Sequence, residues 1–198
     1  TPLTNFWYFL ESNNFTYKIF NTEGGQRNLK YFLNYLNNNK NLLNEKGNFF
    51  FVHQLSPHAP MTVNSDCKKV DYRVYGSDYY EETYDGYKNS YLCVLSEIRD
   101  FINFIETNDP EALIAFMGDH GTYIKSKASI MSDKIFFRAN IFNAIKAPNS
   151  CFDKYGIPRT TVNVTRFLLN CSYNLNLEYR EILHIVGQGK IEKKIIYD

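Results

Sequence analysis

The sequence lacks the features that mark several large classes of protein. Its net charge at pH 7 is only +1, and it has no basic face or stripe, which argues against nucleic acid as a partner. No apolar run reaches the roughly 18 residues of a membrane-spanning helix, and no secretory signal peptide opens the chain. The four cysteines include no CxxC pair, which excludes the usual zinc-knuckle and thioredoxin-type signatures.

What is present is typical of a globular protein. The chain has 198 residues, of which 44% are hydrophobic and 22% are charged, so residues 1–198 are expected to form one domain with a sizeable core. Cys93 lies in an apolar helical pattern and is expected to be a buried thiol. One or two disulfides remain possible, but the spacing of the cysteines does not show which residues would pair.

Hydrophobic periodicity divides the chain into helices and short strands. Helical spacing predicts helices over residues 3–10, 29–36, about 91–108, 134–146 and 162–173. Compact apolar runs predict strands over residues 17–20, 49–55 and 112–117, and short edge strands over residues 182–186 and 191–197. Residues 61–85 are polar and rich in tyrosine, and they are expected to form a surface loop. The alternation of apolar strands with amphipathic helices predicts an α/β fold with a mostly parallel sheet sandwiched between helices.

Two of these predicted strands end on histidine-bearing loops. The first run, FFFVHQL, leads into SPHAP with His58, and the second, ALIAFM, leads into GDHG with Asp119 and His120. Ligands of open α/β sheets collect beyond the carboxyl ends of the strands. Asp119 and His120 offer one oxygen and one nitrogen ligand to a divalent cation such as zinc. Gly118 and Gly121 are expected to let the backbone bend around the ion.

Each motif alone is weak evidence for a metal site, because a lone histidine is more often a structural residue than a ligand. His58 could add a second metal ligand or could contact an anionic substrate. Neither role follows from the spacing alone. The combination of two strand-end motifs separated by a predicted helix is the stronger signal.

The same segments resemble a known family. FFFVHQLSPHAP, YKNSYLCVLSEIRDFINFIE and ALIAFMGDHG are similar to consecutive segments of the alkaline phosphatase superfamily, in its sulfatase and phosphoethanolamine or phosphoglycerol transferase branch. TTVNVTRFLLNCSYNLN resembles the closing segment of membrane-linked sulfatase-like proteins of bacterial surface-polysaccharide loci. The resemblance implies an alkaline-phosphatase-like α/β fold whose N-terminal part is missing, so the chain would be the C-terminal portion of a catalytic domain.

The resemblance also implies roles for particular residues. Asp119 and His120 would be ligands of a divalent metal, with zinc favoured and calcium or manganese as alternatives. His58 would be catalytic and substrate-binding, as a second-metal ligand or as a contact to the phosphate or sulfate group. His53 is a candidate only for a supporting residue that contacts the ligands and not the metal or substrate itself. Where relatives often carry a further His or Lys after the DHG motif, this sequence offers Lys125 as the best candidate for an anion contact.

The implied function is a metal-dependent hydrolase or transferase that acts on phosphate or sulfate esters of a surface polysaccharide or lipid. The nucleophile and an N-terminal acidic ligand of the family would lie upstream, so this chain alone is expected to be inactive. The resemblance implies an extracytoplasmic location with membrane tethering through upstream helices. It does not indicate an oligomeric state. One alternative is a non-catalytic relative that binds polysaccharide or a partner protein, and another is a purely structural α/β domain.

Overall fold

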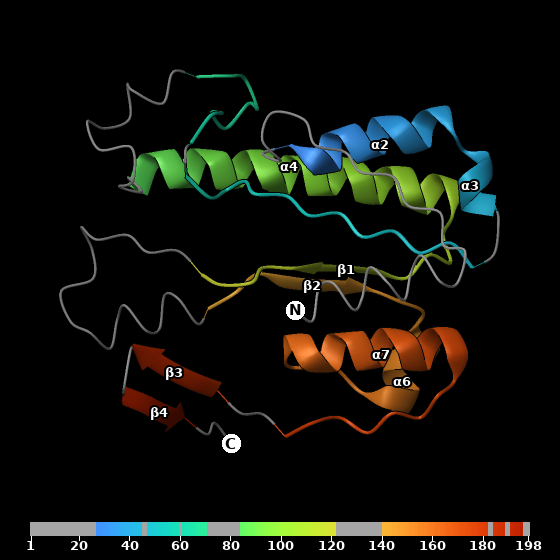
Figure 1. The fold of residues 1–198 in the computed structure, drawn as a ribbon. Helices are drawn as coiled ribbons and strands as arrows, with labels where there is room; N and C mark the ends of the chain where they lie inside the picture. Colours follow the sequence, from blue (N-terminus) through green and yellow to red (C-terminus); the bar gives the residue numbers. More distant parts are fainter. Residues whose placement is uncertain are drawn as a thin grey trace, which may run out of the picture.

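The structure is a computed structural model, which describes residues 27–44, 47–59, 61–70, 84–121, 140–181, 184–188 and 191–195. The predicted helix at 3–10 and the predicted strand at 17–20 lie outside these residues. The described helices are α2 (Asn28–Asn38), α3 (Asn41–Asn44), α4 (Tyr84–Asn108), α6 (Asn149–Tyr155) and α7 (Thr161–Tyr173). The described strands are β1 (Ile114–Met117), β2 (Asn143–Lys146), β3 (His184–Gln188) and β4 (Ile191–Ile195). Figure 1 shows α2 and α4 on one side of the β1–β2 pair, and α6 and α7 on the other.

The hydrophobic core lies where α2 packs on α4. The predicted helices at 29–36 and about 91–108 are confirmed, although α4 begins earlier, at Tyr84. The apolar residues of α2 recur at helical spacing and therefore share one face. Phe32 of α2 stacks on Phe101 of α4 with ring centroids 5.8 Å apart. The buried cluster consists of Leu29, Phe32, Leu36, Phe101 and Ile105.

The sheet differs from the prediction. β1 confirms a strand within residues 112–117, but it pairs antiparallel with β2, with Ile114 opposite Lys146. The end of the helix predicted at 134–146 is instead the strand β2, because residues 143–146 pair with β1. In addition, the Lys146 ammonium donates to the carbonyl of Ala112 at 3.3 Å. Residues 134–139 lie outside the described ranges. Both strand pairs in the described parts of the chain are antiparallel, so a parallel sheet is not confirmed there.

Residues 49–55 do not form the doubly buried strand that the sequence predicts. They run extended without a ladder partner among the described residues, and Phe51 is 79% exposed. Burial alternates along the segment: Val52 packs against the core cluster and Gln54 is half-buried, while their neighbours are exposed. This period of two is that of an extended chain with one covered face. The Gln54 side chain accepts a hydrogen bond from the backbone N–H of Leu29 at 2.9 Å, which attaches the segment to α2.

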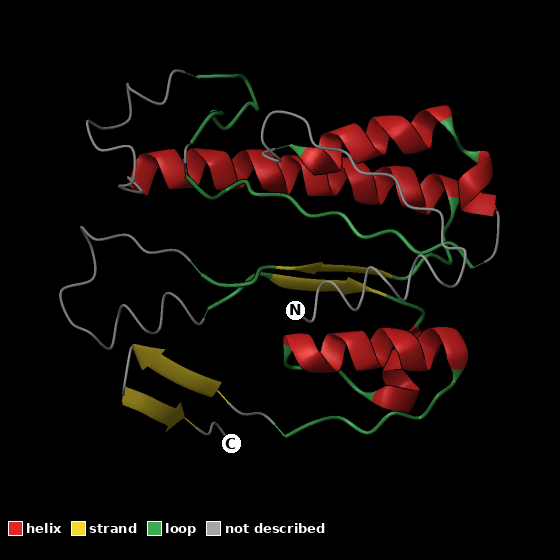
Figure 2. Cartoon of the chain, in the orientation of Figure 1, coloured by secondary structure: helices red, strands yellow, loops and turns green. Residues whose placement is uncertain are grey.

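The C-terminal part contains a helix pair and a hairpin. α7 confirms the helix predicted at 162–173, and Thr160 caps it by accepting a hydrogen bond from the Asn163 N–H. The short helix α6 was not predicted. β3 and β4 confirm the two short strands predicted near the C-terminus, and they pair with each other as an antiparallel hairpin. Figure 2 shows this hairpin as a unit distinct from the β1–β2 pair.

Candidate functional site

His58 is presented by a turn that α4 holds in place. The hydroxyl groups of Ser56 and Ser90 share a hydrogen bond of 2.9 Å, and both residues are buried. The His58 N–H donates to the carbonyl of Leu55 at 2.7 Å, which closes the turn. The imidazole itself is exposed. The turn therefore has a fixed base on the helix and a histidine that is open to solvent.

Asp119 and His120 follow β1 on a second loop. The Gly118 N–H donates to the carbonyl of Phe142 at 2.8 Å, which extends the pairing of the strands by one step. The Phe142 ring in turn packs edge-on against Tyr91 of α4, with centroids 6.5 Å apart. A Cβ built on Gly118 would meet Phe142 backbone at 3.6 Å, an ordinary contact. The prediction that Gly118 relieves crowding is therefore not supported by its surroundings.

The two loops converge. The imidazole rings of His58 and His120 have centroids 6.4 Å apart and an interplanar angle of 63°. The neighbouring residues Ser90 and Tyr91 of α4 attach one loop each, through Ser56 and through Phe142. His58 and His120 are thus close together in the structure, although residues 49–55 do not share a sheet with β1, and α4 contacts both loops.

Both histidines have a tautomer that suits metal coordination. The Nδ1 atom of His58 lies 2.6 Å from the Ala59 carbonyl, and that of His120 lies 2.9 Å from the Gly121 carbonyl. In the neutral tautomer with the proton on Nδ1, each ring would donate to its carbonyl and the lone pair would lie on Nε2. A ligating histidine commonly donates its other ring N–H to a carbonyl in this way.

Asp119 supplies the oxygen of the candidate donor set. Its carboxylate is 88% exposed, and Oδ1 accepts the N–H of His120 at 2.9 Å. Oδ2 lies 3.7 Å from Nε2 of His120, so both donors face the same region. One carboxylate oxygen and one imidazole nitrogen fit a divalent cation such as zinc. Among the described residues these donors belong to no compact group of three or more ligands, so the described part of the site offers two neighbouring ligands with His58 beside them.

The structure describes only one of the two other candidates. Lys125 lies outside the described residues. His53 is exposed on the extended segment, where its backbone carbonyl accepts a hydrogen bond from the Asn28 side chain at 2.6 Å. The one compact group of metal-ligating residues found in the described ranges is Cys67, Cys93 and Glu97. Its two cysteines are joined as a disulfide, so they offer no thiolates to a metal.

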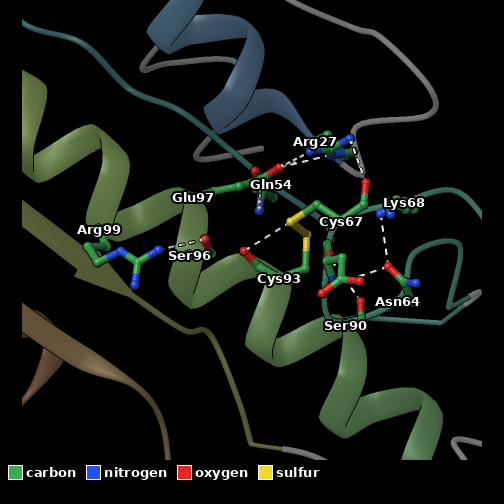
Figure 3. Close-up of a disulfide and its surroundings, with 12 residues drawn as sticks. Arg27, Gln54, Asn64, Cys67, Lys68, Ser90, Cys93, Ser96, Glu97 and Arg99 are labelled. Atoms are coloured by element: carbon green, nitrogen blue, oxygen red, sulfur yellow. Dashed lines mark hydrogen bonds and ion pairs between the residues drawn. A yellow bond between two sulfur atoms is a disulfide. The ribbon is translucent and has the colours of Figure 1, made fainter.

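That disulfide corrects a prediction. Cys93 is buried, as expected, but it is bonded to Cys67 and is not a thiol. Next to it, the buried carboxylate of Glu97 forms an ion pair with Arg27, whose Nε lies 2.8 Å from Oε1. Figure 3 shows the disulfide between Cys67 and α4, with the Arg27–Glu97 pair beside it.

Sequence reasoning missed this polar face of α4, although a signal was present. Ser90, Cys93 and Glu97 recur at the i, i+3 and i+7 positions of a helix face. Ser90 bonds Ser56 and Cys93 bonds Cys67, while Glu97 bonds both Arg27 and Gln54. The polar face of an amphipathic helix ordinarily meets water, so the spacing indicates that these residues share a face, and the structure adds that all three are buried.

Comparison with known proteins adds the family. A family model described as Sulfatase matches residues 3–158. No curated protein and no solved structure matched the chain. The matched region contains His58, Asp119 and His120, and it covers well over half of the sequence. Members of this family have an alkaline-phosphatase-like α/β fold and generally use a divalent metal. The chain belongs to the sulfatase family and, through it, to the alkaline phosphatase superfamily.

Proposed function

We propose that this chain carries part of the active site of a metal-dependent hydrolase or transferase that acts on phosphate or sulfate esters of a surface polysaccharide or lipid. Family membership suggests the ester chemistry in general terms. The observation that carries the proposal is the convergence of His58 with Asp119 and His120 at the ends of two separate segments. A purely structural domain gives no reason for this convergence.

Asp119 and His120 would hold the cation through a carboxylate oxygen and Nε2. Zinc is the metal we favour, because mixed oxygen and nitrogen donors suit it, with calcium or manganese as alternatives. When bound, the cation would act as a Lewis acid toward an oxygen of the ester group. The Gly121 carbonyl would keep the His120 proton on Nδ1 and thereby keep Nε2 directed at the metal.

His58 would act beside the metal rather than as part of the same ligand pair. Its Nε2 lone pair can take a proton, and the resulting imidazolium can donate to an anionic oxygen. The fixed Ser56–Ser90 base would hold the turn while the exposed ring contacts the phosphate or sulfate group. Lys125 remains our candidate for a further anion contact.

The donor set of the described residues is incomplete for catalysis. Catalytic zinc sites have three protein ligands, and the described part of this chain supplies two neighbouring ones. We therefore propose that the remaining ligand and the nucleophile come from residues outside the described ranges or from sequence that this chain does not include. The isolated chain is expected to bind zinc weakly and to leave aryl phosphate and aryl sulfate uncleaved.

Zinc titration tests the assignment of ligands. We expect Asp119→Asn and His120→Gln each to weaken zinc binding at least tenfold in isothermal titration calorimetry, because each removes one of two ligands. His58→Gln is expected to have a smaller effect, and His53→Gln, on the exposed segment, is the matched control. Equal zinc affinity in the wild type and in the Asp119→Asn/His120→Gln double variant would contradict the assignment.

A second candidate function, polysaccharide binding without catalysis, is favoured by a shallow, open groove between α6 and the segment that follows α7. This groove has a volume of about 370 Å³ and is lined by tyrosines 155 and 179, with Lys154, Asn176 and Glu178. Half-buried rings with mixed hydrogen-bonding groups suit a sugar. Saturation-transfer NMR with maltose and cellobiose tests it: binding that Tyr179→Ala abolishes supports a sugar groove, and the absence of any transfer excludes it for these sugars.

We further propose an extracytoplasmic location with membrane tethering in the full-length protein. The Cys67–Cys93 disulfide supports such a location, because structural disulfides persist mainly in oxidising compartments. None of the helices in the described ranges has the length and apolar character to cross a bilayer.

A further inference from the structure

Two more cysteines lie together on the other side of the molecule, between α6 and α7. Cys151 belongs to α6 and Cys171 to α7, and both are free thiols. The Cys151 side chain is close enough to contribute to the raised pKa of Cys171. The packing of the helices explains the proximity. Phe152, which follows Cys151, stacks on Phe167 with ring centroids 4.8 Å apart. Phe167 lies one helical turn before Cys171, so both cysteines lie within a turn of the contact between α6 and α7.

The segment after α7 holds this arrangement in place. The Asn170 side chain bonds the backbone of Leu177 twice, donating to its carbonyl at 3.0 Å and accepting its N–H at 2.7 Å. The Tyr155 hydroxyl at the end of α6 donates to Asn174 at 2.7 Å. These bonds join the end of α6 to the residue that follows α7, and α7 to the segment beyond it.

We propose that Cys151 and Cys171 are the site of a second disulfide, which forms when the protein folds in the presence of a small disulfide oxidant such as oxidised glutathione. Both residues are half-buried, so a small oxidant can reach them. They lie on different elements from His58, Asp119 and His120, and the proposal does not depend on the proposed function. The bond would cross-link α6 to α7 and would hold the groove beside them.

The chemistry is thiol–disulfide exchange. The Cys151 thiolate attacks one sulfur of the oxidant and expels the other half as a thiolate. The Cys171 thiolate then attacks the Cys151 sulfur of the mixed disulfide and expels the second half. Two protein thiols are oxidised, one oxidant disulfide is reduced to two thiols, and the two protons of the protein thiols go to the two expelled thiolates.

The order of attack follows from burial. Burial, and then the neighbouring Cys151, raises the pKa of the Cys171 thiol from its ordinary 9.0 to about 12. Only the thiolate is nucleophilic, so Cys171 is poorly suited to attack first at neutral pH and is better placed as the resolving thiol. We therefore expect formation of the bond to accelerate as the pH rises.

Refolding with oxidised glutathione, followed by alkylation and peptide mapping without reduction, tests the proposal. We expect peptides linked 67–93 and 151–171, with no free thiol in the folded chain. The variants Cys151→Ser and Cys171→Ser should each leave one alkylatable thiol and an intact 67–93 link. If either variant fails to fold, the map of the wild type decides alone. Two free thiols at 151 and 171 in a folded chain that already has the 67–93 link would overturn the proposal, as would any other pairing.

Discussion

The hydroxyl groups of Ser56 and Ser90 lie 2.9 Å apart, and this hydrogen bond joins the turn that carries His58 to the N-terminal part of α4. Ser90 is 1% exposed and Ser56 is 7% exposed, so water cannot easily replace either partner. The bond therefore has consequences both for stability and for the position of the histidine.

We expect Ser90→Ala to lower the free energy of unfolding by about 1–3 kcal/mol, because it leaves the buried Ser56 hydroxyl without its partner. The Ser56→Ala/Ser90→Ala double variant should lose less than the sum of the single variants. Urea denaturation measures both, and Ser65→Ala at an exposed position is the control. A loss in Ser90→Ala no larger than in the control would contradict the role of this bond.

The pair formed by Arg27 and Glu97 predicts a larger effect. Their side chains are 14% and 8% exposed, so removal of one partner leaves a charge that is poorly solvated. Arg27→Met should cost about 3–5 kcal/mol, and a second change, Glu97→Leu, should restore much of the loss. Thermal unfolding of the single and double variants measures the coupling. If the two changes simply add, the pair does not contribute as described.

Loss of the Cys67–Cys93 disulfide should lower the free energy of unfolding by about 2–4 kcal/mol. The bond closes a loop between residues 26 apart in the sequence, so much of the effect arises in the unfolded chain. The change is Cys67→Ala/Cys93→Ala, assayed by urea denaturation without reductant. A midpoint equal to that of the oxidised wild type would show that the bond adds no stability.

The reduced protein should lose stability in alkali. The pKa of Cys171 is raised in the folded state from 9.0 to about 12, and that of Tyr179 is raised from 10.0 by burial and then by Cys171. Both groups bind their protons more tightly when folded, so their contribution is complete below about pH 9 and falls as the pH rises toward about 12.

Urea midpoints measured in reductant at several alkaline pH values test this dependence. The fall should be shallower in Cys171→Ser, which removes the more strongly shifted group. Because all four cysteines are reduced in parent and variant alike, the 67–93 disulfide does not enter the comparison. Parallel curves for the two proteins would exclude Cys171 as the cause.

Long periodic segments were the most predictable part of the fold. The helices α2, α4 and α7 have apolar residues at helical spacing over several turns, and each was predicted from that pattern. β2 was not, because its four residues Asn143–Lys146 carry no pattern of their own and become a strand only by pairing with β1. α6 is only seven residues long, and its packing on α7 through Phe152 is a tertiary effect.

The motifs of the candidate site could be predicted from the sequence, but the contacts that hold the two loops in place could not. His58, Asp119 and His120 follow apolar runs, and the link between the two loops was proposed from those strand ends. The exposure of Phe51 and the antiparallel pairing of β1 were not foreseen, since both depend on which segments become neighbours. The bonds of Ser90, Cys93 and Glu97 join distant residues, and only coordinates identify such partners.

The three bonds on one face of α4 also set how that helix can change. Consecutive residues of an α-helix are rotated by about 100° about its axis. A single residue inserted between Ser90 and Glu97 would therefore turn one of these two side chains away from its partner while the other kept its bond. Substitutions along α4 at positions other than Ser90, Cys93 and Glu97 leave these attachments in place, whereas a change in the length of the helix between them does not. We therefore expect homologous chains that keep these attachments to vary in residue identity along this stretch and to keep its length constant.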